Sequence, residues 1–382
     1  MQIESLQQEF QKIYGRHPEI YRAPGRVNLI GEHTDYNDGF VMPAAINFFT
    51  WLAISPRSDS TINIRSRAFS EPVSILLNGD LRPRHTWSDY VVGIIDQIRR
   101  SGKKLAGADI LIQSEVPMGS GLSSSAAIEV AAGFSLLKTN QYAVDRTELA
   151  LLCQRAENLF VGMRCGIMDQ FISCNGTIDH ALMLDCRSLD FRLLPLSPTS
   201  RMVICNTMVK HEHASGEYNK RRDECETGVL ILREFIPEIR ALRDVSAREL
   251  EQHRERLPET IYRRCRHVVT ENDRVERAGK ALEQHDMKKF GTLMAQSHAS
   301  LRDDYQVSSG ELDLMVDIAN RQSGIFGARM TGGGFGGCTI NLVEASQAER
   351  FRDSVANEYK KVTGLSPEIY ISTAADGANQ VQ

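Results

Sequence analysis

The apolar residues of the chain repeat with helical spacing in some segments and form short strand-like runs in others, which predicts a mixture of helices and strands. Apolar positions over residues 4–14 fall on one helical face and predict a short amphipathic helix near the start. The same period over residues 87–100 and 146–161 predicts two further helices. Runs rich in β-branched residues predict strands at 50–54, 61–66, 73–76 and 109–112.

The second half of the chain continues the alternation of strands and helices. The expected elements are strands at 180–187 and 201–206, a long helix opening at 215, a largely helical region over 230–300, a helix at 345–361 and a strand at 368–372. A proline-containing stretch at 195–198 separates the two halves. A chain of 382 residues is long enough for two domains that each bury a core, so we expect domains at 1–195 and 196–382.

The composition is that of an ordinary globular protein, with 42% hydrophobic and 25% charged residues. A formal net charge of −4 excludes a generally basic nucleic-acid binder. The eight cysteines form no Cys-x-x-Cys pair, so we expect free thiols in a reducing compartment rather than a zinc site or a disulfide framework. The first residues carry no basic and apolar leader, and no apolar run reaches the roughly 20 residues that cross a bilayer. We therefore expect a cytoplasmic protein with no nucleic-acid or membrane partner.

A loop rich in glycine and serine at 116–127 follows the strand at 109–112 and opens into an apolar helix of small residues. Strand, flexible loop and helix in this order is a phosphate-binding arrangement, because glycines let an anion approach the backbone and the first helical turn points N–H groups at it. A helix uses one hydroxyl as its N-cap, so two of Ser123, Ser124 and Ser125 are expected to face phosphate oxygens or a phosphate-bound Mg²⁺. The loop has no lysine and is not a Walker A loop, and a solvated linker is the alternative.

A second group of polar residues lies between the apolar pieces at 27–30 and 40–42. Its members are Arg26, Glu32, His33, Asp35 and Asn37. Charged and hydrogen-bonding groups in so short a segment suit a polyhydroxy ligand, since each sugar hydroxyl both donates and accepts. The alternative is a surface hairpin whose charges face water.

Two acidic residues stand among apolar neighbours. Asp169 lies within the apolar segment 165–171, and Glu157 lies near the apolar stripe of the helix predicted at 146–161. Burying an unpaired carboxylate is costly, so Asp169 is expected to be paired or functional. Glu157 is either a surface residue of its helix or an inward carboxylate that completes a Mg²⁺ shell with a serine hydroxyl and phosphate oxygens.

The glycine-rich run at 327–338 contains a formal Gly-x-Gly-x-x-Gly at Gly332, Gly334 and Gly337. A strand is predicted directly after it, at 339–343, whereas a dinucleotide-binding loop must open a helix. The run is therefore not a Rossmann fingerprint.

The loop sequence Pro-x-Gly-x-Gly-Leu-Ser-Ser-Ser-Ala resembles the phosphate-loop signature of the GHMP family of small-molecule kinases, and the stretches at 22–43 and 327–338 match two further motifs in the expected order. The resemblance covers nearly the whole chain. It implies two α+β domains, an N-terminal one like the second domain of ribosomal protein S5 and a C-terminal ferredoxin-like one. ATP and a sugar would lie in the cleft between them.

Within that family, the stretch Gly-Arg-Val-Asn-Leu-Ile-Gly-Glu-His-Thr-Asp-Tyr at 25–36 resembles the signature of the branch that phosphorylates galactose. The resemblance implies phosphoryl transfer from ATP, with Mg²⁺, to the C1 hydroxyl of α-D-galactose, giving galactose 1-phosphate and ADP. We expect a monomer whose ligands are galactose and MgATP. A related kinase of N-acetylgalactosamine or arabinose is one alternative. A catalytically silent regulator that responds to sugar and ATP is another, which the intact serine run at 123–127 and the presence of Asp169 disfavour.

The resemblance also assigns residues to each ligand. Sugar contacts fall on Glu32, His33, Thr34, Asp35, Gly166, Asp169 and Tyr218. Nucleotide contacts fall on Ser66, Gly119, Ser120, Gly121, Leu122, Ser123, Ser124 and Ser125. Metal contacts fall on Ser125 and Glu157. In this scheme Glu32 and His33 hold the 6-hydroxyl end of the sugar and Asp35 holds its ring hydroxyls.

The same resemblance makes Asp169 the general base, with Arg26 beside it and beside the transferring phosphate. A nearby arginine keeps an aspartate ionised but also weakens it as a base. We therefore expect Asp169 to orient the hydroxyl and accept a late-transferred proton. Arg26 is expected to offset the charge that develops on the phosphoryl oxygens.

Overall fold

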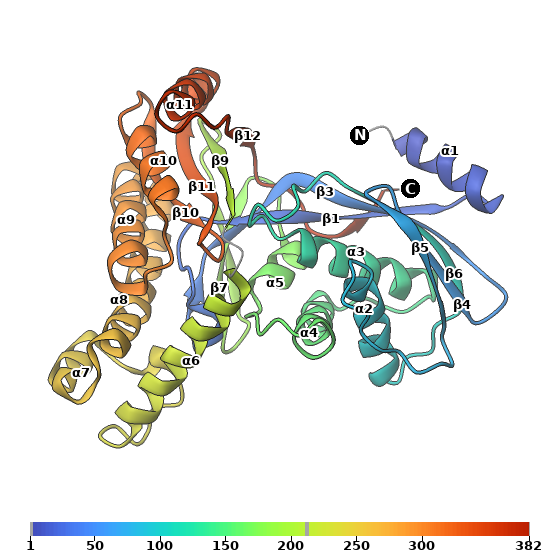
Figure 1. Ribbon diagram of the computed structural model, residues 1–382, viewed down its shortest axis with the longest axis horizontal. Coiled ribbons are helices and arrows are strands. Elements are labelled where there is room, and N and C mark those ends of the chain that lie inside the picture. The colour runs from blue at the N-terminus through green and yellow to red at the C-terminus, as the bar shows by residue number, and fades with distance from the viewer. Residues whose placement is uncertain (1–2, 211–213, 382) are drawn as a thin grey trace.

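A computed structural model describes residues 3–210 and 214–381, which form two large sheets with their helices and a small third sheet (Figure 1). The first sheet has six strands in the order β13-β1-β3-β6-β4-β5. Its strands are β1 (Glu19–Asn28), β3 (Pro43–Pro56), β4 (Thr61–Ser66), β5 (Phe69–Leu76), β6 (Ala108–Ser114) and β13 (Asn379–Gln380). Its pairs are antiparallel except for β4 and β6, which run parallel.

Both faces of the first sheet are covered, because side chains along its strands alternate between two apolar clusters. Tyr21, Leu52 and Ile54 pack on one face against four helices. These helices are α2 (Asp89–Arg100), α3 (Ser124–Thr139), α4 (Arg146–Ala156) and α5 (Met168–Asn175). Ile20 and Ala53 point to the opposite face, which the amphipathic helix α1 (Ile3–Tyr14) covers (Figure 1).

The second sheet has four antiparallel strands in the order β10-β11-β9-β12. Its elements are β9 (Ser200–Lys210), α10 (Gly310–Asn320), β10 (Ile325–Thr331), β11 (Gly336–Glu344), α11 (Ala348–Thr363) and β12 (Glu368–Ser372). This β-α-β-β-α-β order with the first strand central is the ferredoxin-like arrangement that the sequence resemblance implies. Helices α10 and α11 pack on one face of the sheet, and helix α9 (Met287–Ser300) packs on the other (Figure 1).

The remaining elements connect these two parts. The third sheet consists of β2 (Phe40–Val41), β7 (His180–Asp185) and β8 (Phe191–Pro195). The connecting helices are α6 (Ala214–Arg233), α7 (Ala247–Gln252) and α8 (Glu259–Glu283). The short helical turns are η1 (Asp35–Asn37), η2 (Glu157–Val161), η3 (Leu242–Asp244), η4 (Arg254–Arg256), η5 (Leu301–Tyr305) and η6 (Ala345–Gln347). One apolar cluster joins Leu29 beside β1 to Met294 of α9 and Ile340 of β11. The two large sheets therefore share a core, and the polar segment that follows β1 lies at their junction.

Most predicted elements are found, with three differences. The helix predicted at 146–161 is α-helical only to Ala156 and continues as the π-helical turn η2, which begins at Glu157. The glycine-rich run at 327–338 begins inside strand β10 rather than in a loop. The sequence analysis made no prediction of helices α5 and α10 or of strand β8.

The domain division at residue 195 stays a prediction. Strand β8 ends at Pro195 and β9 begins at Ser200, but β13 at the end of the chain returns to pair with β1. Within the part of the chain that the structure describes, no helix has the length and hydropathy that crossing a membrane requires.

Candidate active site

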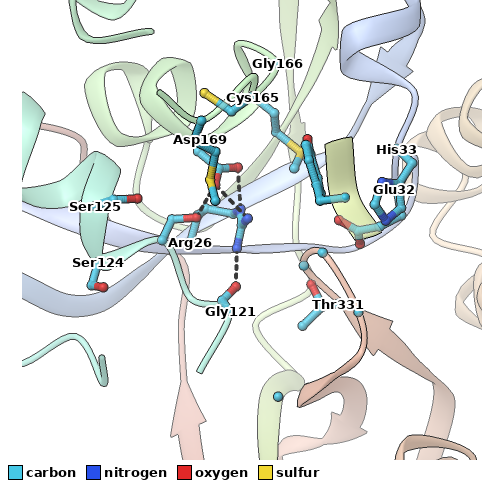
Figure 2. A pocket seen from close by; sticks show the side chains of 18 of the residues that line it. Arg26, Glu32, His33, Gly121, Ser124, Ser125, Cys165, Gly166, Asp169 and Thr331 are labelled. Atoms are coloured by element: carbon cyan, nitrogen blue, oxygen red, sulfur yellow. Dashed lines mark hydrogen bonds and ion pairs between the residues drawn. The ribbon is translucent and has the colours of Figure 1, made fainter. Parts of the chain in front are cut away.

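A pocket of about 440 Å³ lies where the segment after β1, the loop before α3 and the loop between β10 and β11 meet. Thirteen residues to which the sequence analysis assigned a role line it: Arg26, Glu32, His33, Asp35, Gly119, Gly121, Ser123, Ser124, Ser125, Glu157, Gly166, Asp169 and Tyr218. Figure 2 shows Arg26 and Asp169 near its centre, with Ser124 and Ser125 on one side and Glu32 and His33 on the other. The glycine- and serine-rich loop at 116–127, which we call the serine loop, and the polar segment at 26–37 thus face one cavity, with Asp169 between them.

Four assigned residues lie outside the lining of this pocket. The Thr34 hydroxyl donates to the carbonyls of Gly31 and Phe40, at 2.9 and 2.7 Å, and so closes the turn of the polar segment. The Ser120 hydroxyl donates to the Pro117 carbonyl at 2.7 Å. Their contacts are those of residues that shape the loops.

The other two are Ser66 and Leu122. The Ser66 hydroxyl accepts from the Ala68 N–H at 3.2 Å, at the end of β4. The Leu122 side chain is buried in the shared core, and its carbonyl accepts from the Arg26 N–H at 3.1 Å. The Leu122 backbone therefore anchors the serine loop to β1.

The centre of the pocket is the ion pair between Arg26 on β1 and Asp169 on α5. Arg26 Nε donates to Asp169 Oδ1 and Arg26 Nη2 donates to Asp169 Oδ2, both at 2.8 Å. Arg26 Nη1 donates to the Gly121 carbonyl at 2.5 Å. The predicted proximity of Arg26 and Asp169 is confirmed, and the same guanidinium also holds the serine loop.

The capping prediction for the serine loop is wrong in one respect. Ser123 occupies the N-cap position of α3 with φ at 57°, in the left-handed region, and its side chain makes no capping bond. Its hydroxyl instead donates to Asp169 Oδ2. Because the first N–H groups of a helix have no partner within it, the first turn of α3 presents donors and a partial positive charge to the pocket.

The next feature is a buried acidic group beside the serine loop. Gln170 Nε2 donates to Glu157 Oε2 at 2.5 Å and to Glu129 Oε2 at 3.2 Å. Burial raises the pKa of Glu157 to about 7, and the charge of Asp169 adds to the shift, while hydrogen bonds from Cys165, Ser125 and Gln170 oppose it. Burial, and then the charge of Glu157, raises the pKa of Glu129 well above its usual range.

The oxygen atoms of Ser125 and Glu157 suit a hard divalent cation. Ser125 and Glu157 both line the pocket and offer a hydroxyl and a carboxylate oxygen, the ligand type that Mg²⁺ prefers. Among the described residues there is no group of three or more His, Cys, Asp or Glu side chains that could hold a metal. A cation here would take its other ligands from phosphate oxygens and water, which is the usual manner of Mg²⁺ binding in phosphoryl-transfer sites.

The side of the pocket that carries Glu32 and His33 is built on a buried ion pair that the sequence analysis missed. Arg329 Nη2, from β10, donates to Glu32 Oε2 at 2.7 Å, and Arg329 Nη1 donates to the Asn28 carbonyl at 3.0 Å. Arg329 is completely buried and Glu32 is only 2% exposed. Arg329 lies in the run at 327–338, which the sequence analysis treated only as glycine-rich, and its partner is 297 positions away, so no local pattern indicated this pair.

His33 and Asp35 both face the pocket in unusual states. His33 has φ at 62°, and burial lowers the pKa of its imidazole to about 3, so the ring is neutral at pH 7. Burial, and then the charge of Asp169, raises the pKa of Asp35 to about 7. Asp35 rests against Gly166, where an added Cβ would lie 1.9 Å from Asp35 Oδ2. Only glycine at that position leaves room for the carboxyl.

Further residues of the lining carried no predicted role. They are Tyr90, Met163, Cys165, Met168, Thr331 and the glycine loop from Gly332 to Gly337. At Gly332, with φ at 85°, an added Cβ would lie 2.9 Å from the Gly121 carbonyl, so the glycine loop packs directly on the serine loop. The apolar residues gave no signal because they are indistinguishable in sequence from core positions.

The two α+β parts, the serine loop at the start of α3 and the glycine loop opposite it define a small-molecule kinase of the GHMP class. Matches to family models agree with this assignment. They are the "Galactokinase galactose-binding signature" over residues 8–56, the "GHMP kinases N terminal domain" over residues 89–177 and the "GHMP kinases C terminal" model over residues 279–361. The chain belongs to the galactokinase family.

Whole-chain comparisons lead to the same family. The galactokinase of Roseiflexus sp. (strain RS-1) is 48% identical over 377 residues, covering 98% of this chain and 96% of that protein. The galactokinase of Chloroflexus aggregans is 45% identical, covering 100% and 98%. The crystal structure of Lactococcus lactis galactokinase complexed with galactose superposes with a TM-score of 0.95 at 34% identity, covering all of both chains. Methanococcus jannaschii mevalonate kinase, with a TM-score of 0.66 at 19% identity over 94% and 99% of the chains, shares the fold.

Proposed function

We propose that the protein transfers the γ-phosphoryl group of ATP to the C1 hydroxyl of α-D-galactose, giving galactose 1-phosphate and ADP. The observation that carries the proposal is the bidentate Arg26–Asp169 pair. It lies in one pocket with the serine loop and with the stretch at 25–36, which we call the sugar-signature segment. The similarity of the whole chain to galactokinases, one of them solved in complex with galactose, supports the choice of galactose as the sugar.

The sugar would lie on the side of the pocket formed by Glu32, His33 and Asp35. Glu32 is held by Arg329, whose Nη2 atom donates to Glu32 Oε2. His33 is neutral and lines the pocket, its Nε2 atom is buried without a hydrogen-bond partner, and the Gly333 backbone lies beside its ring. Polar groups held this way favour a ligand that pairs with all of them, because an analogue lacking a hydroxyl leaves them desolvated and unpaired.

The nucleotide phosphates would lie against the serine loop, where the first turn of α3 supplies donors. The C1 oxygen attacks the γ-phosphorus as the bond to the β–γ bridging oxygen breaks, and the hydroxyl proton passes to Asp169. Arg26 keeps Asp169 ionised and weak as a base, so Asp169 orients the hydroxyl and takes the proton late. Arg26 also faces the charge that develops on the transferring group.

Ser125 and Glu157 are the residues that would hold Mg²⁺. When it is bound, the cation would neutralise negative charge on the β- and γ-phosphate oxygens. Gln170, which donates to Glu157 Oε2, orients the Glu157 carboxylate for this role.

The setting of the enzyme follows from the same features. We propose a monomer in which galactose and MgATP meet between the domains 1–195 and 196–382. All eight cysteines are free, which supports a reducing compartment and hence the cytoplasm.

The decisive experiment measures ADP release by the purified protein with ATP, Mg²⁺ and each of galactose, N-acetylgalactosamine and L-arabinose. We expect galactose to give the highest kcat/KM, and ³¹P NMR of the product to place the phosphate on C1. A higher kcat/KM with either other sugar would replace the proposed substrate. Binding of galactose and ATP without ADP release would make the protein a regulator instead.

A further inference from the structure

The His33 ring is held by a chain of hydroxyl groups that starts outside the pocket. His33 Nδ1 lies 2.8 Å from the Tyr36 hydroxyl, which lies 2.7 Å from the Tyr305 hydroxyl. The Tyr305 hydroxyl lies 3.2 Å from the Cys225 sulfur. Tyr36 comes from η1, Cys225 from α6 and Tyr305 from η5, so three distant segments converge behind one histidine.

Neither tyrosine hydroxyl reaches the ligand cavity directly. Tyr36 and Tyr305 are absent from the pocket lining, whereas His33 lines it through a ring whose Nε2 atom has no partner. The ring centroid of His33 lies 4.9 Å from that of Tyr305 and 5.8 Å from that of Tyr36. The two phenol hydroxyls therefore act on a ligand through the His33 imidazole, while the Tyr36 ring also packs 5.5 Å from the ring of Tyr218 in the pocket lining.

The direction of the hydrogen bonds along this chain decides which nitrogen of His33 carries the proton. A neutral imidazole has one donor and one acceptor nitrogen, and the partner of one nitrogen fixes the role of the other. Tyr305 can give its proton to the Tyr36 oxygen or to the Cys225 sulfur, and a phenol oxygen is a far better acceptor than a thiol sulfur. With Tyr305 donating to Tyr36, the proton of Tyr36 is directed to His33 Nδ1.

We propose that Tyr305 and Tyr36 are positioning residues that hold His33 as the Nε2–H tautomer, so that His33 donates a hydrogen bond to an oxygen on C6 of the sugar. The proposal rests on the proposed function, which places the sugar beside His33. It adds that selectivity for a 6-hydroxyl depends on a phenol chain outside the pocket.

The proton of Cys225 completes the chain. Burial raises the pKa of its thiol to about 11, so the sulfur carries a proton at pH 7. That thiol can donate to the Tyr305 oxygen, and each oxygen in the chain then accepts one hydrogen bond and donates one. The reverse direction ends on the sulfur, which is a weak acceptor.

Sugars that differ only at C6 test the proposal. Galactose carries the 6-hydroxyl, 6-deoxygalactose keeps the carbon without the oxygen, and L-arabinose lacks the whole hydroxymethyl group. For Tyr305→Phe and Tyr36→Phe we expect the preference for galactose over 6-deoxygalactose, as a ratio of kcat/KM, to fall by about fivefold, the effect of losing one hydrogen bond. The loss appears in the KM for galactose, while kcat and the KM for ATP stay unchanged.

A matched control is Tyr359→Phe, which removes another buried phenol oxygen, one that donates to the Thr207 carbonyl at 3.1 Å. It should leave the sugar preference unchanged. Equal losses with galactose and 6-deoxygalactose in Tyr305→Phe would overturn the proposal, because a merely structural role affects both sugars alike.

A second measurement reads the tautomer without catalysis. In ¹⁵N NMR spectra of protein labelled at histidine, with the His33 signals assigned by their loss in His33→Gln, we expect Nδ1 unprotonated and Nε2 protonated. Tyr305→Phe should shift Nδ1 toward the protonated position. A proton on Nδ1 in the unaltered protein overturns the proposal whatever sugar is phosphorylated, whereas absence of activity on galactose with the expected tautomer refutes only the proposed function.

Discussion

Arg26 and Asp169, 143 positions apart in the chain, meet through two parallel hydrogen bonds of 2.8 Å in the pocket between the serine loop and the sugar-signature segment. The Asp169 side chain keeps 27% of its surface exposed, whereas that of Arg26 keeps 6%. The carboxylate is therefore open to a ligand on one side and fixed from behind by the guanidinium. A third bond, from the Ser123 hydroxyl, ties the same carboxylate to the phosphate-binding loop.

Asp169→Asn should separate binding from turnover. The amide keeps the shape of the side chain but cannot accept the hydroxyl proton, so we expect kcat to fall about 100-fold or more. Galactose binding, measured by calorimetry, should change little. Asp303→Asn, which alters an exposed aspartate paired with Arg302, is the control and should leave kcat unchanged. Near-normal turnover by Asp169→Asn would remove this residue from the mechanism.

Metal dependence should follow Glu157 and Ser125. Chelation of divalent cations should abolish turnover, and added Mg²⁺ should restore it. Glu157→Gln and Ser125→Ala each remove one oxygen donor, so we expect the Mg²⁺ concentration for half-maximal rate to rise about tenfold or more. The KM for galactose should not move, since neither residue is on the sugar side of the pocket.

The control for this prediction is Glu358→Gln, which alters an exposed glutamate paired with Arg321 on the surface. It should keep the Mg²⁺ requirement of the unaltered protein. An unchanged Mg²⁺ requirement in both site variants would mean that the cation is held elsewhere.

The sequence predicted the residues of this site better than their contacts. Arg26, Asp169 and the serine loop belong to contiguous motifs, so the family resemblance could assign them to one site. The hydroxyl of Ser123 was expected either to cap α3 or to face a ligand, because capping depends on neighbouring residues alone. Its bond to Asp169 depends on a left-handed backbone and on a helix 46 positions away, which no local pattern contains.

The parts that could not be predicted are tertiary in the same way. Arg329 lies in a strand whose sequence looks like core, and its partner Glu32 lies 297 positions earlier. The Tyr36–Tyr305 contact spans 269 positions. Helix periods and turn residues fix the elements, whereas such pairs arise only when the two sheets share a core.

Asp35 should make stability depend on pH. Its pKa is raised to about 7 in the folded protein, whereas an aspartate in an unfolded chain titrates near about 3.9. Between these values the folded state holds a proton that the unfolded state has lost. This group's contribution to stability is therefore greatest at low pH and falls by about 1.4 kcal/mol per pH unit until the folded carboxyl ionises.

Asp35→Asn mimics the protonated carboxyl at every pH, so its free energy of unfolding should lack this contribution to the slope. We expect the gap between variant and unaltered protein, from urea unfolding, to grow in favour of the variant as the pH rises from about 4 to about 7. Asp38→Asn, at an exposed neighbouring position paired with Arg187, is the matched control. Stability curves that run parallel for Asp35→Asn and the unaltered protein would show that Asp35 titrates normally.

The buried pair of Glu32 and Arg329 should couple the two parts of the molecule. Arg329→Met leaves the Glu32 carboxylate buried without its cation, so we expect the free energy of unfolding to fall by about 3–5 kcal/mol. The double variant Glu32→Gln with Arg329→Met should recover much of this loss, because no charge is then left unpaired. Arg321→Met, which breaks an exposed pair with Glu358, should cost less than about 1 kcal/mol. If the buried and exposed arginines cost the same, or the double variant is no more stable than Arg329→Met, the pair does not hold the sugar side of the pocket together.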